Sequence, residues 1–238
     1  WESYIERTGD LVLFKDFYDT SLDKLSSKEK VIYRLGGDAL RNASRIIYST
    51  DWQRKIFEKV YKLDSSKSLI IENYCGEREE PIDPESRVFV AATRELKWKN
   101  IEKLRSAFKS AKEEVRRNGL EDIEFDTSKA VYDNFQERMR RSYAVVLTSL
   151  GDISPNMIFD AIRLGVPFIL TKETGIYDRV KDCAVFVDPT NEDDIRDRII
   201  WMSDPKNRKL QAEKIRNFKW IHTWDDICKE IISLYGKI

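Results

Sequence analysis

The chain has 238 residues, with 42 lysines and arginines balanced by 42 aspartates and glutamates, so its formal net charge is zero. This balance argues against a nucleic-acid-binding module, whose surface normally carries a basic excess, and against a polybasic membrane-surface protein. No apolar stretch reaches the roughly 18 to 20 residues of a membrane span, and the segment that begins at Trp1 lacks the basic and apolar parts of a secretory signal.

The first 45 residues give mixed signals. Leu11–Phe14 is expected to form a strand, and Ser26 with Glu29 forms a capping box that begins a helix. The pair Gly36-Gly37 is expected to interrupt that helix. This region looks like the tail of a Rossmann-like unit.

From residue 46 onward, short apolar strands alternate with amphipathic helices. The predicted strands are residues 46–49, 68–71, 88–92, 123–125, 144–148, 167–170 and 184–187. The predicted helices follow the cap at Thr50 and then span residues 100–118, 133–142, 155–164, 193–202, 205–218 and 224–235.

This alternation, with its runs of Val, Ile and Ala, predicts an α/β fold: a Rossmann-like parallel sheet with helices on both faces. Ligands of such sheets bind beyond the carboxyl ends of the strands. The functional site is therefore expected in the loops after Ala92, Phe125, Thr148 and Leu170.

Metal and histidine chemistry are both disfavoured by the sequence. Cys75, Cys183 and Cys228 are far apart, no Cys-x-x-Cys pair occurs, and His222 is the single histidine. No zinc site is therefore expected, and a Ser-His-Asp or Cys-His site would need His222 as its base. At its place between tryptophans, His222 is expected to be structural. Such dispersed cysteines are typical of a reducing compartment, so a cytoplasmic protein is expected.

An anion site is predicted where a helix follows the strand at residues 144–148. Ser154 is expected to be its N-cap and Pro155 its first residue. The amides of Asn156 and Met157 are then free at the positive end of the helix, where a phosphate can bind.

Two carboxylates flank this helix start. Asp152 lies in the loop before it, and Asp160 lies more than one turn inside it, so each can lie on one side of a bound molecule. The alternative is that Asp152 is an ordinary turn residue and Asp160 a solvated helix position.

Two cations follow the strand at residues 88–92. Arginine suits bidentate phosphate contacts and lysine supplies a mobile point charge, so Arg94 and Lys99 are candidate phosphate ligands. The alternative is an ordinary basic loop. Taken together, the two loops describe a crevice in which cations and free amides face a pyrophosphate.

These stretches resemble the nucleotide-sugar half of retaining glycosyltransferases of the GT-B architecture, family 4 type. The hallmark of that family is Ser-x-x-Glu-x-x-Pro, a second Glu, and Ala-x-x-x-Gly-x-Pro. The residues at these places are Ser149, Asp152, Pro155, Asp160, Ala161, Gly165 and Pro167. The Gly-Arg loop of the family, with a Lys five residues later, is matched by Arg94 and Lys99, with Thr93 in place of the Gly. Smaller matches are Asn73, Asp188-Pro189 and Trp224.

The resemblance implies roles for these residues. Asp152 would approach the hydroxyls of the donor sugar and Asp160 the ribose, while Arg94 and Lys99 would hold the diphosphate and stabilise its charge as the sugar departs. No metal or other cofactor is then required. Both family glutamates are aspartates here, one methylene shorter, which leaves open a different donor or a loss of activity.

Two further positions are candidates for donor contacts. The resemblance places the loop of residues 172–175, and with it Gly175, beside the sugar and phosphate, although a plain turn remains an alternative. Thr127 follows another strand end and could flank the base.

The resemblance also implies a division of the chain. Residues 1–72 would be the C-terminal remnant of an acceptor-side domain, and residues 73–238 the donor-binding domain with the closing C-terminal helix. The missing initiator Met and the length together give the expectation of a fragment that lacks its N-terminal domain. The implied partners are a nucleotide-sugar donor and an unknown glycan or lipid-linked acceptor, with no nucleic acid. Peripheral membrane contact of the full-length protein is left open.

Three functional hypotheses follow. The leading one is a hexosyltransferase that moves a sugar from a nucleoside diphosphate to an acceptor with retention, in polysaccharide, glycolipid or glycoconjugate synthesis. The second is a non-catalytic or truncated nucleotide-sugar-binding module. The third, a nicotinamide dehydrogenase, is disfavoured because no G-x-G-x-x-G follows an early strand.

Overall fold

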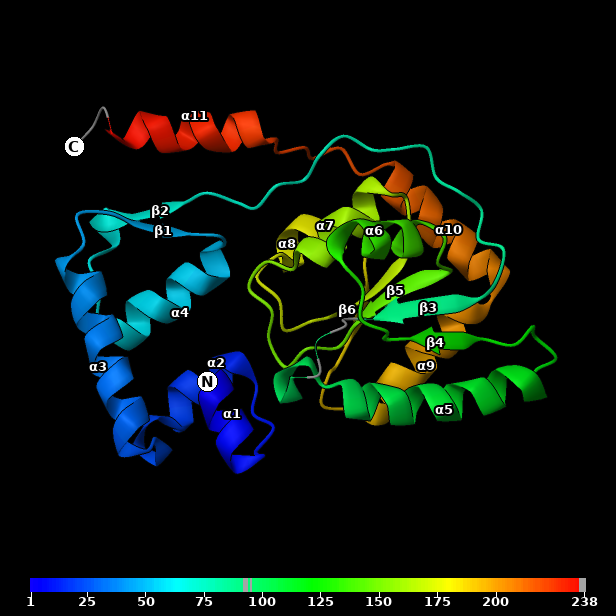
Figure 1. Ribbon diagram of the computed structural model, residues 1–238, viewed down its shortest axis with the longest axis horizontal. Coiled ribbons are helices and arrows are strands. Elements are labelled where there is room, and N and C mark those ends of the chain that lie inside the picture. The colour runs from blue at the N-terminus through cyan, green and yellow to red at the C-terminus, as the bar shows by residue number, and fades with distance from the viewer. Residues whose placement is uncertain (92–93, 95, 236–238) are drawn as a thin grey trace.

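The computed structural model describes residues 1–91, 94 and 96–235. Figure 1 shows two parts of the molecule, each with its own sheet. We call residues 1–72 the N-terminal unit and residues 88–216 the sheet unit. The N-terminal unit contains α1 (Glu2–Thr8), α2 (Phe14–Thr20), η1 (Leu22–Lys24), α3 (Ser27–Asn42), β1 (Ile46–Tyr48), α4 (Asp51–Tyr61), η2 (Ser65–Lys67) and β2 (Ser68–Ile70).

The sheet unit begins with β3 (Val88–Ala91), η3 (Lys97–Lys99), α5 (Ile101–Arg117), β4 (Glu124–Asp126), α6 (Tyr132–Arg140) and β5 (Ala144–Leu147). It continues with α7 (Asn156–Arg163), β6 (Phe168–Thr171), α8 (Tyr177–Val180), β7 (Val185–Val187), α9 (Glu192–Ser203) and α10 (Pro205–Arg216). The last helix of the chain is α11 (Trp224–Tyr235).

The sheet unit confirms the predicted fold class. Its five strands are all parallel, in the order β4-β3-β5-β6-β7, with the fully buried β5 at the centre. Alternate residues of β5 enter opposite cores: Val146 packs with α5 and α9, and Val145 packs with α7 and α10. A strand buried on both faces must be apolar throughout, which explains why these segments are continuous runs of Val, Ile, Leu and Ala.

The N-terminal unit contains a two-stranded parallel sheet, β1-β2. Two predicted helix starts are confirmed here: the backbone N–H of Glu29 donates to the side chain of Ser26, and the N–H of Gln53 donates to the hydroxyl of Thr50. These caps satisfy amides that have no partner within the helix.

Two expectations for this region are wrong. Leu11–Phe14 is no strand; residues 11–13 are irregular and Phe14 begins α2. Leu11 is exposed while the consecutive residues Val12 and Leu13 both pack against the apolar cluster of the N-terminal unit, which the alternating faces of a strand would not allow. Gly36-Gly37 does not interrupt α3 either. A Cβ added to Gly37 would lie 2.9 Å from Cδ1 of Tyr61, so this glycine permits close packing of α3 on α4.

The closing helix α11 lies apart from the five-stranded sheet. Figure 1 shows it crossing back above β2 of the N-terminal unit. Its first residue, Trp224, stacks on Tyr74 with the ring centroids 5.3 Å apart. The domain boundary after residue 72 stays a prediction.

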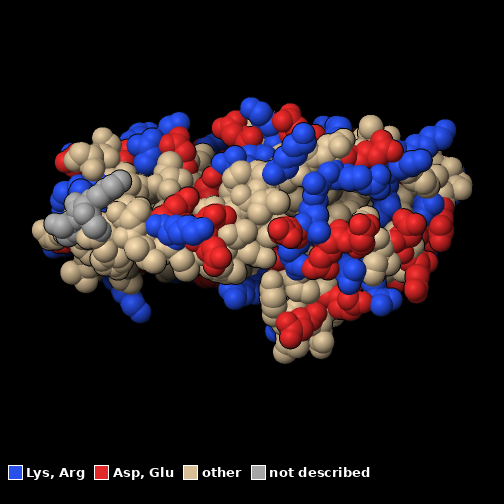
Figure 2. All heavy atoms as spheres, turned by 90° about the horizontal axis from the view of Figure 1, so that it is seen from above, with Lys and Arg blue, Asp and Glu red and all other residues tan. Residues whose placement is uncertain are grey.

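The surface carries both signs of charge. Figure 2 shows lysines and arginines interspersed with aspartates and glutamates over the face in view. None of the helices within the described ranges is long and apolar enough to cross a membrane.

Candidate active site

Lys99 and Asp152, which are 53 residues apart in sequence, meet at the carboxyl end of the sheet. Their Nζ and Oδ2 atoms are 2.7 Å apart, and their side chains are only 14% and 13% exposed. The Ser149 hydroxyl donates to the same Oδ2 at 3.3 Å, and the Lys99 ammonium lies 4.1 Å from the centre of the Trp98 ring. Two residues that the sequence assigns to one crevice are therefore in direct contact.

The loop that carries Asp152 is tied to the loop after β6. The Asp152 N–H donates to the Glu173 carbonyl at 2.9 Å, and the Gly175 N–H donates to the Asp152 carbonyl at 3.0 Å. A Cβ added to Gly175 would lie 2.3 Å from the Ile153 carbonyl oxygen and 2.4 Å from Oγ1 of Thr50. The predicted site residue Gly175 thus lies beside Asp152, where the backbone approach needs a glycine.

The start of α7 corrects one prediction. The helix begins at Asn156 with Pro155 as its N-cap, so Ser154 is not the cap and Pro155 is not the first helical residue. Asn73 instead donates its side-chain amide to the Ser154 carbonyl and to Oδ1 of Asn156, at 3.1 and 2.7 Å. Among the described residues, no acceptor bonds to the backbone amides of Asn156 and Met157, as the sequence predicts.

Asp160 is not a solvated helix position. It is 9% exposed, and burial raises the pKa of its carboxyl. The Tyr132 hydroxyl donates to its Oδ1 at 3.4 Å, and Nη2 of Arg163 lies 3.7 Å from the same atom. These contacts join Asp160 to Tyr132 of α6 and to Arg163, one turn further along its own helix α7.

Two predicted site residues take no part in these contacts. Arg94 is exposed and makes no hydrogen bond or ion pair with the residues that the structure describes; its neighbour Thr93 lies outside them. The Thr127 hydroxyl accepts a hydrogen bond from Arg105 at 3.2 Å. Their roles towards a donor stay predictions.

Lys15 is a residue near the site that the sequence reasoning did not single out, whereas its partner Glu173 lies in the loop of residues 172–175 that the resemblance places there. Glu173 is 4% exposed, and its Oε1 lies 2.8 Å from the ammonium of Lys15, a residue of α2. This hydrogen bond is the main cause that raises the pKa of Lys15. Nothing local to Lys15 indicates that it reaches the sheet unit.

A cleft of about 260 Å³ lies between the two units beside Asp152. It is lined by Trp1, Glu2, Phe14, Ser49, Gln53 and Asn73 on one side and by Trp98, Gly151, Asp152, Ile153 and Ser154 on the other. The indole N–H of Trp98 and the hydroxyl of Ser154 are buried with no partner in the part of the chain that the structure describes.

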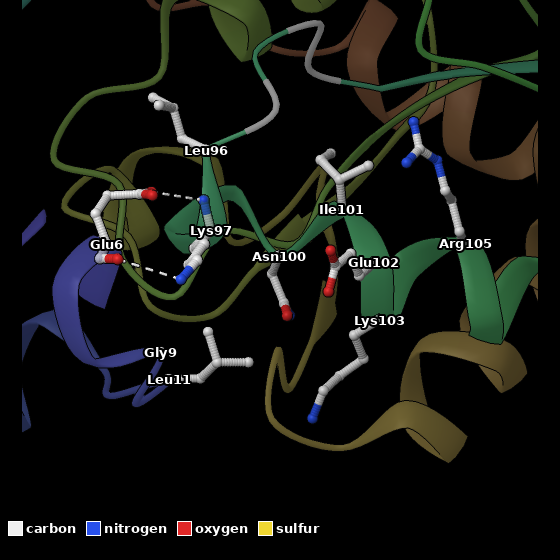
Figure 3. Close-up of a pocket in the computed structure, with 10 residues that line it drawn as sticks. All are labelled: Glu6, Gly9, Leu11, Leu96, Lys97, Asn100, Ile101, Glu102, Lys103 and Arg105. Carbon is white, nitrogen blue, oxygen red and sulfur yellow. Dashed lines mark hydrogen bonds between the residues drawn. The ribbon is translucent and has the colours of Figure 1, made fainter.

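A larger cavity of about 680 Å³ lies between α1 and the start of α5, and Figure 3 shows the residues that line it. Its cations are already engaged: the Lys97 ammonium donates to the Glu6 carbonyl at 3.2 Å, as Figure 3 shows. The Lys103 ammonium donates to the Thr190 carbonyl at 2.8 Å, and Arg105 donates to the Thr127 hydroxyl at 3.2 Å. Asp152 does not line it, whereas Asp152 lines the smaller cleft. The smaller cleft is therefore the candidate site.

Asn100 fixes the turn between Lys99 and α5. It is buried with a left-handed φ of 61°, and its side-chain amide donates to the carbonyls of Thr148 and Pro189 at 3.2 and 2.7 Å. Asparagine tolerates this backbone conformation better than most residues.

Replacing Asn100 by Ala is expected to lower the free energy of unfolding by about 3 kcal/mol, since it leaves two buried carbonyls without this donor and strains the backbone. Urea unfolding followed by circular dichroism measures the loss. Asn100→Gly removes the same hydrogen bonds without the strain, so it should lose less. Equal stabilities of Asn100→Ala and the wild type would contradict the role given to this side chain.

Within the described ranges, no group of three or more His, Cys, Asp or Glu side chains could hold a metal ion. The cleft itself is lined by Asp152 and Ser154. The groups next to the cleft that suit an anion are the buried ammonium of Lys99, which contacts Asp152, and the amides of Asn156 and Met157, which follow Ser154. Such groups stabilise negative charge on a phosphate.

No protein-family model matches the chain, and no curated protein matches it in sequence. Solved structures do match. Sucrose-phosphate synthase (tll1590) from Thermosynechococcus elongatus is 14% identical with a TM-score of 0.65, over 94% of this chain and 65% of that one. WaaG, a glycosyltransferase involved in lipopolysaccharide biosynthesis, is 14% identical with a TM-score of 0.68, over 89% and 69%. Anabaena Alr3699/HepE in complex with UDP-glucose is 15% identical with a TM-score of 0.68, over 92% and 70%.

This likeness shows the fold: the chain shares the α/β architecture of GT-B glycosyltransferases. It spans 65% of the length of the sucrose-phosphate synthase structure and 70% of that of HepE.

Proposed function

We propose that this chain forms the donor side of a glycosyltransferase that takes a sugar from a nucleoside diphosphate. The observation that carries the proposal is the buried Lys99–Asp152 pair, 2.7 Å apart at the carboxyl end of a parallel sheet beside a helix start with free amides. The fold shared with HepE, which was solved with UDP-glucose, supports it.

The chemistry follows from the charges. When the bond between the sugar and the diphosphate breaks, negative charge develops on the phosphate oxygens. Lys99 and the amides of Asn156 and Met157 stabilise that charge, with Arg94 as a second cation. Asp152 accepts hydrogen bonds from the donor sugar. We propose that transfer retains the configuration of the sugar, on the strength of the family 4 motif, and that the sugar is a hexose.

Asp160 is proposed to contact the ribose. Its carboxyl is buried against α7, and a hydroxyl of the ligand would add a donor to those of Tyr132 and Arg163. The backbone of Gly175 is proposed to lie beside the sugar and phosphate of the donor, and Thr127 is proposed to flank the base.

A nucleotide-sugar-binding module without catalysis is the second candidate. The observation that favours it is that the shorter Asp152 and Asp160 stand at both positions where the family motif has a catalytic-site Glu, and that Asp152 is already paired with Lys99.

The acceptor side is proposed to need more protein than residues 1–72. The N-terminal unit exposes an apolar stripe on α3 and one face of β1: Val31, Ile32 and Leu35 are 48, 58 and 61% exposed, and Ile47 is 49% exposed. A parallel pair of strands is normally covered on both faces. We propose that a further acceptor-side part covers the exposed stripe of α3 and binds a glycan or lipid-linked acceptor.

Calorimetry with UDP, GDP, ADP and their sugars tests the donor site. We expect one nucleoside diphosphate to bind in the micromolar range, with its sugar conjugate binding at the same site, because the crevice offers a cation and free amides to phosphates. A folded chain that binds none of these compounds would contradict the proposal.

A transfer assay with the proposed acceptor-side part added separates the enzyme from the binding module. The anomeric coupling constant of the product reports retention, and an inverted product would contradict that part of the proposal.

A further inference from the structure

The loops that carry Lys99 and Asp152 belong to the sheet unit, yet both are anchored in the N-terminal unit. Leu150, two residues before Asp152, is 1% exposed and lies in the apolar cluster of the N-terminal unit. Trp98, directly before Lys99, packs on the same cluster, with its ring centroid 5.4 Å from that of Trp1. The other buried members of this cluster are Tyr4, Ile5, Phe17 and Leu25.

The backbone joins the same three segments. The Leu150 N–H donates to the Trp98 carbonyl at 2.9 Å, and the Phe14 N–H, at the start of α2, donates to the Leu150 carbonyl at 3.0 Å. A Cβ added to Gly151 would lie 2.3 Å from Cβ of Phe14, so the loop lies directly on α2. Leu150 is therefore held by its side chain and by both of its backbone polar groups.

The first turn of α2 also contacts the loop after β6, which is hydrogen-bonded to Asp152. Lys15 follows Phe14 and pairs with Glu173 at 2.8 Å, and the Glu173 carbonyl accepts the Asp152 N–H at 2.9 Å. Phe14 and Lys15, two adjacent residues of α2, thus contact both the loop that contains Asp152 and the loop that is hydrogen-bonded to it.

From these contacts we propose that Leu150 is a positioning residue: its side chain, buried in the N-terminal unit, sets the Lys99–Asp152 geometry of the diphosphate crevice. This proposal rests on the proposed function for its ligand. The physical reason is that packed side chains leave few alternative arrangements, so a loop anchored this way keeps its charged residue in place. Docking of the N-terminal unit and formation of the crevice are then one event.

The test compares two deletions in the same apolar cluster, Leu150→Ala and Leu25→Ala. Both remove the same atoms and both are expected to destabilise the chain, but only Leu150 adjoins the site. In Leu150→Ala, the Kd for UDP, or for whichever diphosphate the wild type binds, should rise at least tenfold, with less than a twofold rise in Leu25→Ala. Hydrogen exchange at the Asp152 and Gly175 amides is measured against exchange at the Val145 amide of β5 in the same variant. This ratio should rise at least tenfold over the wild type in Leu150→Ala and should not change in Leu25→Ala. Leu150→Met should restore both values.

Equal changes in the two alanine variants, in affinity and in exchange, would overturn the proposal and leave Leu150 an ordinary core residue. If the wild type binds no nucleoside diphosphate, the proposed function fails, while the exchange comparison still decides the role of Leu150.

If Leu150→Ala does not fold, Lys15→Ala serves as the second variant, because Lys15 is half exposed and only its contact with Glu173 is lost. Its control is Lys59→Ala, which removes the exposed pair with Asp19 in the same unit. Faster exchange at the Asp152 amide in Lys15→Ala alone supports positioning by α2, and identical exchange in both variants contradicts it.

Discussion

Replacing Lys99 by Ala is expected to lower the rate of sugar transfer by about 10² to 10³-fold, the range found when one preorganised donor to a developing oxyanion is removed. Lys99 is 14% exposed, so its charge acts on the diphosphate with little screening by water. The substitution also leaves Asp152 without its counter-ion next to the phosphates, which weakens binding of the donor.

The rate is measured as release of the nucleoside diphosphate, which also reports donor hydrolysis by water and so needs no identified acceptor. Lys103→Ala is the matched control, because it removes the same charge four residues along and its ammonium binds the Thr190 carbonyl away from the cleft. Lys99→Arg should fall between the two, since it keeps the charge but not the geometry. Should Lys99→Ala and Lys103→Ala behave alike, Lys99 does not bind the diphosphate.

Replacing Gly175 by Ala is expected to reduce the free energy of unfolding by about 3 kcal/mol or more, at the upper end of what overpacking costs. The added Cβ would lie 2.3 Å from the Ile153 carbonyl oxygen and 2.4 Å from Oγ1 of Thr50, and a backbone oxygen cannot rotate away. The contact joins the N-terminal unit to the loop of Asp152, so nucleotide binding should weaken with it.

Gly36→Ala provides the control for this substitution. A Cβ at Gly36 meets no atom within 4 Å, and the residue lies inside α3. Alanine there should stabilise the chain by about 0.5 to 1 kcal/mol, because it reduces the backbone entropy of the unfolded state. Urea unfolding of both variants measures the difference, and a Gly175→Ala chain as stable as the wild type would show that the two units are not in this contact.

The sequence predicts most of the five-stranded sheet correctly because its signals are local. A strand such as β5 that is covered on both faces must be apolar at every position, and the helices between strands show apolar residues at helical spacing. The same alternation places loops at the carboxyl ends of the strands. Lys99 and Asp152 follow two such strands, so the sequence assigns them to one crevice, and in the structure their side chains are 2.7 Å apart.

The errors lie where contacts distant in sequence decide the outcome. Gly37 reads as a helix breaker, but Tyr61 from α4 packs against it and the helix continues. Ser154 reads as a helix cap, but the helix begins one residue later, next to the contacts of Asn73.

The sequence by itself therefore determined the α/β class, the succession of strands and helices along the chain, and the residue types near the site. These depend on periodicity and helix caps, which involve residues that are close in sequence. Only the tertiary structure decided that Leu150 is buried in the other unit, that Lys15 pairs with Glu173, and that Asp152 is already paired with Lys99. Each of these contacts joins segments that many residues separate in sequence. The contacts of Leu150 and Lys15 also join the two units, so they exist only once both units have folded and docked, whereas the contact of Lys99 with Asp152 needs only the folded sheet unit.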